Sequence, residues 1–237
     1  MSHTSAAVAW TRIGLVALPA YGLLLAGSTL TPQPDQTLDP AAWAQFVTGP
    51  GYLVQHLLTN VVGAVLVVLG TVALGAFLAS GRAARLALPG MVVAVAGQVL
   101  LMVPGVISTF VTPAIGAAYL DGNTDVMSLQ IQDTVTPIFL IALVLTVAGN
   151  VILGVDVWRS GLAARWAGAL WAAAGVVFYL AGAFLGMATT GASLPTQPVG
   201  GLMMAASGAA IAWSSLHGPR VDAAVPDPAA DAVAENR

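Results

Sequence analysis

The sequence contains no cysteine and no lysine, and only 7% of its 237 residues are charged. The lack of cysteine excludes disulfides, cysteine-ligated zinc, iron–sulfur clusters and thiol nucleophiles. Soluble domains carry about a quarter charged residues, so these charges could not cover the surface of a water-soluble globule. Because 58% of the residues are hydrophobic, we expect the apolar surface to face lipid. The net charge of −3 gives no reason to expect nucleic-acid binding.

Six segments have the roughly 20 mainly apolar residues that a membrane-crossing helix needs. The predicted fold is therefore all-α, a polytopic transmembrane bundle over residues 1–218. A tail rich in Ala, Pro and Asp, 219–237, is expected to be disordered and cytoplasmic. The first span could instead be a cleaved signal peptide because it ends in small residues, but its basic n-region is weak. The predicted spans cover residues 10–30, 52–79, 87–110, 137–157, 166–187 and 199–216.

The arginines predict the orientation of the bundle. In a six-span arrangement all of them fall on one side, at Arg12, Arg82, Arg85, Arg159, Arg165, Arg220 and Arg237. The opposite loops contain no basic residue and hold Asp35, Asp39, Asp121, Asp125 and Asp133. Since arginine and lysine favour the cytoplasmic side, we expect both termini in the cytoplasm of a bacterial plasma membrane. A five- or seven-span count would scatter the arginines over both sides.

The apolar character of the third span continues to residue 120. A single helix over 87–120 would be about 50 Å long, which exceeds the hydrocarbon thickness of a bilayer. Proline removes a backbone donor and clashes with the preceding turn. We therefore expect a kink near Pro104, a break before Pro113, and a short interfacial or re-entrant helix over 113–120.

A second short helix is expected in the first outer loop, over residues 39–47. It begins with Asp39 before a proline, and Trp43 and Phe46 follow at helical spacing. Such an apolar face suits a helix that lies in the membrane interface.

Two of the connections between spans are similar to each other. SGRAAR at 80–85 and SGLAAR at 160–165 share the pattern S-G-x-A-A-R. This predicts a parallel repeat of helical hairpins, spans two–three and four–five, although an Ala/Gly-rich composition could also produce it by coincidence. Glycines recur at matching offsets and predict close helix packing; they are Gly70, Gly75, Gly90 and Gly97 in one hairpin and Gly149, Gly154, Gly168 and Gly175 in the other.

Ionisable side chains are nearly absent from the spans. Asp156 is the one acid within a predicted span, and Arg159 follows one turn later, which predicts an interfacial ion pair. His56 and His217 lie near opposite faces, about 30 Å apart, so they cannot ligate one haem iron. No acids or further histidines accompany His56, and no Walker, dinucleotide-binding or H-E-x-x-H motif occurs. We therefore predict no catalytic residue, metal or cofactor.

Uncharged polar residues form the candidate site. Gln55, His56, Thr59 and Asn60 lie on one side of span two, and Gln98 of span three lies close to the depth of Asn60. An Asn60–Gln98 hydrogen bond is therefore expected. Interhelical hydrogen bonding alone could explain this set, and the sequence favours that interpretation. The functional alternative is a polar patch in an outward-facing cavity, roofed by the segment 113–120.

Three sequence segments indicate a resemblance. They are PAAWAQFVTGPGYLVQHL (40–57), STFVTPAIGAAYL (108–120) and RWAGALWAAAG (165–175). With the span pattern, they resemble an uncharacterised family of six-span integral membrane proteins from high-GC Gram-positive bacteria. The likeness covers nearly the whole chain. It implies the topology and, because that family has no established activity, no binding residues.

Three classes of function fit these features. The first is a non-enzymatic membrane protein that binds a lipid or apolar small molecule, or scaffolds a partner; its partners would be membrane lipids, a second copy or another membrane protein. The second is a small permease or exporter subunit, although coupling to an ion usually needs an acid at membrane depth. The third is a membrane enzyme or redox carrier, which the lack of paired histidines and buried carboxylates disfavours. We expect the first.

Overall fold

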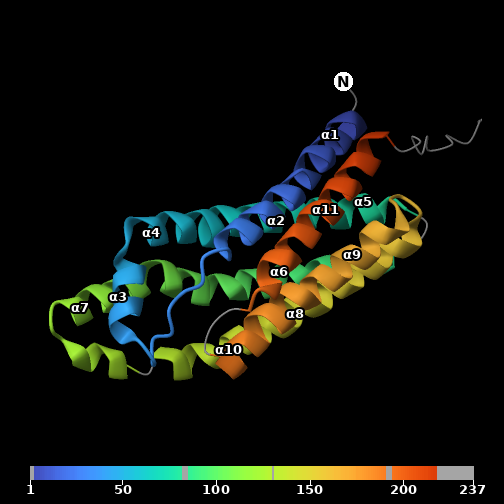
Figure 1. Cartoon of the computed structure of the whole chain (residues 1–237). Coiled ribbons are helices and arrows are strands. Elements are labelled where there is room, and N and C mark those ends of the chain that lie inside the picture. Colours follow the sequence, from blue (N-terminus) through green and yellow to red (C-terminus); the bar gives the residue numbers. More distant parts are fainter. Residues whose placement is uncertain (1–2, 82–84, 130, 191–193, 218–237) are drawn as a thin grey trace, which may run out of the picture.

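The computed structural model describes residues 3–81, 85–129, 131–190 and 194–217, and within them all regular secondary structure is helical (Figure 1). In this described part, six helices are long and apolar enough to cross a membrane: Ala6–Ser28, Pro50–Ala79, Ala87–Leu120, Val135–Ser160, Arg165–Phe184 and Thr196–His217. The predicted helical bundle of six spans is therefore confirmed, and it indicates a multi-pass membrane protein. The tail predicted at 219–237 lies outside the described residues.

Most spans are built from more than one helical element. Span one comprises α1 (His3–Leu15) and α2 (Ala17–Ser28); span two comprises α4 (Pro50–His56), the π-helical η1 (Leu57–Val62) and α5 (Gly63–Ala79). Span three comprises α6 (Ala87–Val106), the π-helical η2 (Ile107–Val111) and α7 (Thr112–Leu120). Span four is α8 (Ile131–Ser160), and span six is α11 (Thr196–His217). Span five comprises α9 (Arg165–Gly175) and the π-helical η4 (Val176–Phe184), and α10 (Leu185–Thr190) continues it. The short helices α3 (Pro40–Thr48) and η3 (Thr124–Ser128) lie in connections.

The two ends of the bundle differ in charge. One end holds the N-terminus of α1, the C-terminus of α11 and the two connections with the repeated turn (Figure 1); we call it the arginine end, and its described arginines are Arg12, Arg85, Arg159 and Arg165. The opposite end, the acidic end, carries α3 and the loops with Asp35, Asp39, Asp121 and Asp125. The alternation of charge expected from six spans is thus present.

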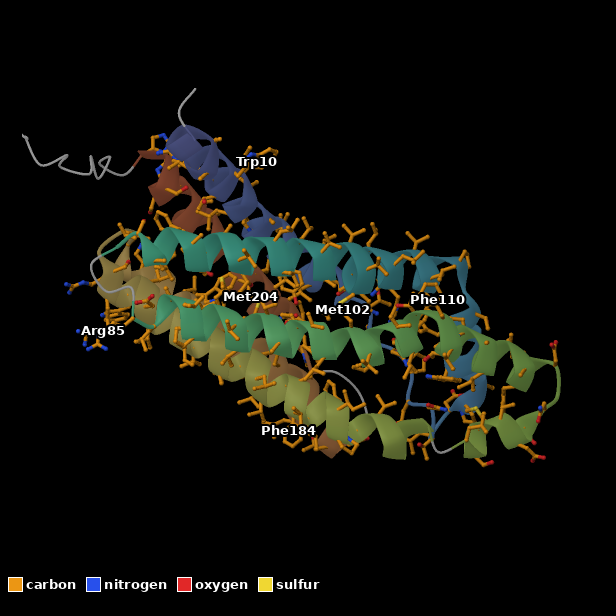
Figure 2. All side chains as sticks on the ribbon, turned by 180° about the vertical axis from the view of Figure 1, so that it is seen from behind. Trp10, Arg85, Met102, Phe110, Phe184 and Met204 are labelled. Atoms are coloured by element: carbon orange, nitrogen blue, oxygen red, sulfur yellow. The ribbon has the colours of Figure 1, made fainter. Side chains whose placement is uncertain are left out.

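Large apolar side chains cover the outside of the bundle. Trp10 is 71% exposed and Phe110 is 53% exposed, and both point away from the neighbouring helices, whereas Met204 lies at the centre (Figure 2). Water would disfavour so much exposed apolar surface. This outer surface fits contact with lipid.

Close contacts between small residues hold the spans together, as the glycine spacing predicted. A methyl group added at Gly154 of α8 would lie 2.6 Å from the carbonyl oxygen of Gly168 in α9. One added at Gly201 of α11 would lie 2.6 Å from the backbone nitrogen of Ala26 in α2. Without a hydrophobic driving force between helices in lipid, such close approach supplies dispersion contacts instead. The first span also contributes Leu18, which is fully buried, to the core.

The third span is one continuous helix, so the predicted break before Pro113 and the re-entrant helix over 113–120 are wrong. Pro104 lies inside α6 without ending it, and Pro113 lies in the first turn of α7. Between them the backbone takes up a π-turn, in which the N–H of Thr112 bonds to the carbonyl of Ile107, five residues back. This wider turn keeps the helix hydrogen-bonded up to the proline. The helix is about 50 Å long.

The helix predicted over 39–47 is confirmed as α3, and its position in the membrane interface stays a prediction. Asp39 caps it, since its Oδ1 accepts a hydrogen bond of 2.9 Å from the backbone N–H of Ala42. Its apolar face packs against α7, where Gly116 leaves room for Val47. The face is covered by protein because Trp43 is only 3% exposed. We call the residues packed here the acidic-end cluster: Trp43, Ala44, Val47 and Tyr52, with Phe46, Ile115, Tyr119 and Met127.

The hairpin repeat stays a prediction. Gly75 and Gly154 occupy equivalent places, since each faces the other helix of its own hairpin, at Met91 and Ala172 respectively. Gly97 and Gly175 do not occupy equivalent places, although both face α8. Gly175 and α8 belong to the same hairpin, whereas Gly97 belongs to the other one.

The ion pair predicted for Asp156 is not formed as a hydrogen-bonded contact. The Asp156 side chain is 1% exposed, and neither of its carboxylate oxygens has a hydrogen-bond partner in the described residues. Arg159 is exposed. Arg159 is near enough to act electrostatically on the Asp156 carboxylate, but the two side chains point to the exposed and buried sides of α8 and form no hydrogen bond.

Candidate functional site

A cavity of about 380 Å³ lies in the acidic-end half of the bundle. All six spans contribute to its wall, together with the linker after α2 and Phe46 of α3. Its volume is near the lower end for small-molecule sites. The polar residues that line it are Tyr21, Ser28, Thr29, Thr31, Gln33, Gln55, His56, Thr59, Asn60, Gln98, Ser108, Tyr179 and Gln197. The apolar ones are Leu25, Phe46, Ala64, Leu101, Met102, Pro104, Gly105, Phe139, Phe178 and Ala183.

The five residues predicted from the sequence all lie along this cavity: Gln55, His56, Thr59 and Asn60 from span two and Gln98 from span three. The predicted roof is wrong, because none of residues 113–120 lines the cavity. Instead, the exposed linker residues at positions 31 and 33 form part of its wall at the acidic end. A role of the five in binding stays a prediction.

Asn60 connects span two to span three. Its Nδ2 donates to the carbonyl oxygen of Gly105 and to Oγ1 of Thr109, both at 3.1 Å. Gly105 permits this approach because a methyl group there would lie 3.3 Å from Cβ of Asn60. The predicted Asn60–Gln98 hydrogen bond is therefore wrong. Gln98 lies seven residues before Gly105, about 10 Å nearer the arginine end.

Gln98 instead bonds to a pair of tyrosines at the base of the cavity. The hydroxyls of Tyr21 and Tyr179 are 2.7 Å apart, and Nε2 of Gln98 donates to the Tyr179 hydroxyl at 3.1 Å. We call these three residues the base cluster; it joins spans one, three and five, and each member is at most 6% exposed. The two tyrosines were not among the residues predicted from the sequence. Their position within the spans could have indicated them. Tyrosine in membrane helices favours the interfaces, so a tyrosine inside a span is unusual, and its buried phenol needs a hydrogen-bond partner.

His56 is held in a defined orientation near the acidic end. Its Nδ1 lies 2.9 Å from the carbonyl oxygen of Tyr52, and its ring stacks on the Tyr52 ring at a centroid distance of 3.7 Å. Because a carbonyl only accepts, Nδ1 carries the hydrogen and Nε2 of the neutral ring presents a lone pair. Tyr52 is itself anchored, since its hydroxyl donates to the carbonyl oxygen of Ser108 at 3.0 Å.

Gln55 and Thr59 bond mainly to backbone. The Gln55 amide donates to the carbonyl oxygen of Ser28, which ties span two to the end of span one. The Thr59 hydroxyl donates to the carbonyl oxygen of Gln55 at 2.9 Å, within its own helix. These two residues shape the wall of the cavity.

The π-helical segments in the described residues all lie in the wall of this cavity. In each, an N–H bonds to a carbonyl five residues back: Gly63 to Leu58, Thr112 to Ile107, and Leu185 to Leu180. π-Turns are rare and frequently lie at functional sites. They carry much of the lining, namely Thr59, Asn60, Ser108, Phe178, Tyr179 and Ala183. The wider turns thus set the direction in which these side chains point.

No protein family, curated protein or solved structure matches the chain. The resemblance to six-span proteins of high-GC Gram-positive bacteria stays a prediction, as does a homo-oligomer or membrane partner. In the described residues no three His, Asp or Glu side chains gather as metal ligands would. What the cavity can do therefore follows from its own chemistry.

Proposed function

We propose that this protein binds an uncharged, amphipathic small molecule in the cavity and carries out no reaction on it. The observation that supports this is the lining: thirteen of its 23 residues have polar side chains, and none carries a formal charge when His56 is neutral. A charged ligand would lose its hydration without gaining a counter-charge. A wholly apolar ligand would leave the polar groups without partners. An amphipathic molecule satisfies both parts of the wall.

The apolar part of the wall supports a membrane lipid or a similar molecule. Phe46, Phe139 and Phe178 supply aromatic surface to the cavity. Met102 both lines the cavity and is 37% exposed on span three (Figure 2). The bilayer is therefore the natural source of the ligand, with its polar group inside the cavity.

Filling the cavity tests this proposal. Ala64 lines it, whereas the next residue, Val65, is 53% exposed on the lipid-facing side of the same helix. We expect native mass spectrometry of the purified wild type to show one retained neutral lipid or small molecule per chain. Ala64→Phe should lose it, and Val65→Phe should keep it. A wild type that stays free of ligand after reconstitution with total membrane lipids would refute the proposal.

The arginine end is proposed to face the cytoplasm of a bacterial plasma membrane, which places the cavity toward the outside. The distribution of arginines over alternate connections supports this orientation. Because the chain lacks cysteine, single cysteines report directly on topology. In intact cells a membrane-impermeant maleimide should label Asn123→Cys but not Ala164→Cys. The reverse pattern would invert the orientation and leave the cavity unchanged.

A further inference from the structure

The base cluster has more polar hydrogens than its own contacts use. Gln98 carries an NH2 group and each tyrosine one O–H, so the cluster holds four such hydrogens. Its two contacts, Tyr21–Tyr179 at 2.7 Å and Gln98–Tyr179 at 3.1 Å, use one hydrogen each. The Gln98 amide is also close enough to the Tyr21 hydroxyl to hydrogen-bond with it, so one or two hydrogens remain. This count does not depend on which tyrosine donates, nor on which way the Gln98 amide is turned.

The remaining hydrogens lie where a ligand can reach them. All three side chains line the cavity, and each is at least nine-tenths buried. A buried donor without an acceptor is unfavourable, and no described residue outside the cluster forms a side-chain hydrogen bond with it. The neighbouring wall is apolar, with Leu101, Phe139 and Phe178. The base is thus a donor site surrounded by hydrocarbon and aromatic surface.

We infer that the cavity recognises a ligand by a carbonyl oxygen placed at Tyr21, Gln98 and Tyr179. A carbonyl oxygen has two lone pairs and no hydrogen, so one such atom can accept whichever hydrogens the cluster leaves unused. A hydroxyl or amide would also have to place its own hydrogen on an oxygen of the cluster, a requirement that a carbonyl does not have. The ligand class is an uncharged, largely apolar ketone or other terminal carbonyl compound. This inference rests on the proposed function, since it names the ligand of the same cavity.

Two probe molecules that differ by one atom test the inference. The first is 4-decylacetophenone, and the second replaces its C=O by C=CH2, which keeps the shape and removes the acceptor. With wild type in nanodiscs we expect the ketone to bind about tenfold more tightly, the ratio expected for about 1.4 kcal/mol. The infrared carbonyl band of the bound ketone should also move to lower frequency than in protein-free nanodiscs, as a hydrogen-bonded carbonyl does.

Variants of the base cluster connect this selectivity to the three side chains. Replacing all the partners by apolar groups of similar shape costs little stability, so Tyr21→Phe/Gln98→Met/Tyr179→Phe is expected to fold. In it the two probes should bind equally and the band shift should disappear. Tyr119→Phe, a tyrosine of the acidic-end cluster that does not line the cavity, should keep the tenfold ratio.

Each outcome has a distinct meaning. If neither probe binds the wild type, the proposed function fails and this inference fails with it. If both bind equally, a binding cavity exists but carbonyl recognition is refuted. If the triple variant still prefers the ketone, the selectivity arises elsewhere and the assignment to the base cluster is wrong.

Discussion

The two halves of the bundle have different internal construction. In the arginine-end half, helices touch through their backbones, and Gly154 lies against Gly168 with no space for a methyl group. In the acidic-end half, the helices contain π-turns and enclose a polar cavity. Both halves belong to the same continuous spans (Figure 1). Close contacts of small residues continue beside the cavity, as between Gly201 and Ala26, so a span can be fixed by packing and still line a polar cavity where it contains a π-turn.

The largest effect is expected in the closely packed half. Gly154→Val places an isopropyl group where α9 leaves no space even for its first carbon, and a backbone contact cannot move aside as a side chain can. We expect no folded, monodisperse protein in size-exclusion chromatography. Gly27→Val is the matched control, because Gly27 has nothing within 4 Å of the added atom. Normal folding of Gly154→Val would remove the distinction between the halves.

A smaller and local effect is expected at the acidic end. Trp43→Ala removes the largest buried side chain of the acidic-end cluster and should destabilise α3 by about 3 kcal/mol. Because α3 packs on α7 and lies outside the six spans, the bundle itself should remain folded. Hydrogen exchange should therefore become faster for the amides of α3 and stay unchanged in α8 and α9. Equal acceleration in α9 would show that the two halves unfold together.

The smallest effect concerns the polar residues that were expected to bond to each other. Asn60→Leu and Gln98→Leu should each cost about 1 kcal/mol, the usual scale for hydrogen bonds between membrane helices. Since they have separate partners at 3.1 Å, their effects should add to within about 0.5 kcal/mol. A double-mutant cycle of unfolding in detergent micelles measures this. A coupling energy above about 1 kcal/mol would restore the predicted Asn60–Gln98 bond.

Features governed by the membrane could be predicted from the sequence. A lipid environment requires long apolar helices, so the six spans were evident from hydropathy alone. Polar side chains in such helices face the protein interior, which is why Gln55, His56, Thr59, Asn60 and Gln98 could be selected and lie along one cavity. These predictions needed only depth along a helix.

Features that depend on helix rotation and packing could not be predicted. Depth counting placed Asn60 beside Gln98, but the π-turn at 57–62 and the approach of Gly105 direct Asn60 to Thr109. Periodicity gave α3 an apolar face without showing that α7 covers it. Asp156 and Arg159 are one turn apart, yet only one of them points into the bundle. Each error concerns which neighbour a side chain meets, and that is decided by tertiary structure.

Spans two and three contain 30 and 34 residues, and helices of this length reach about 45–50 Å, whereas a hydrocarbon core is about 30 Å thick. If the exposed Trp158 and Trp166 lie at one membrane surface, we expect both helices to rise above the opposite one. The entrance of the cavity then stands among lipid headgroups and water, while its base remains at hydrocarbon depth. A thicker bilayer would then cover that polar entrance with acyl chains, so we expect the protein to favour a membrane of limited thickness.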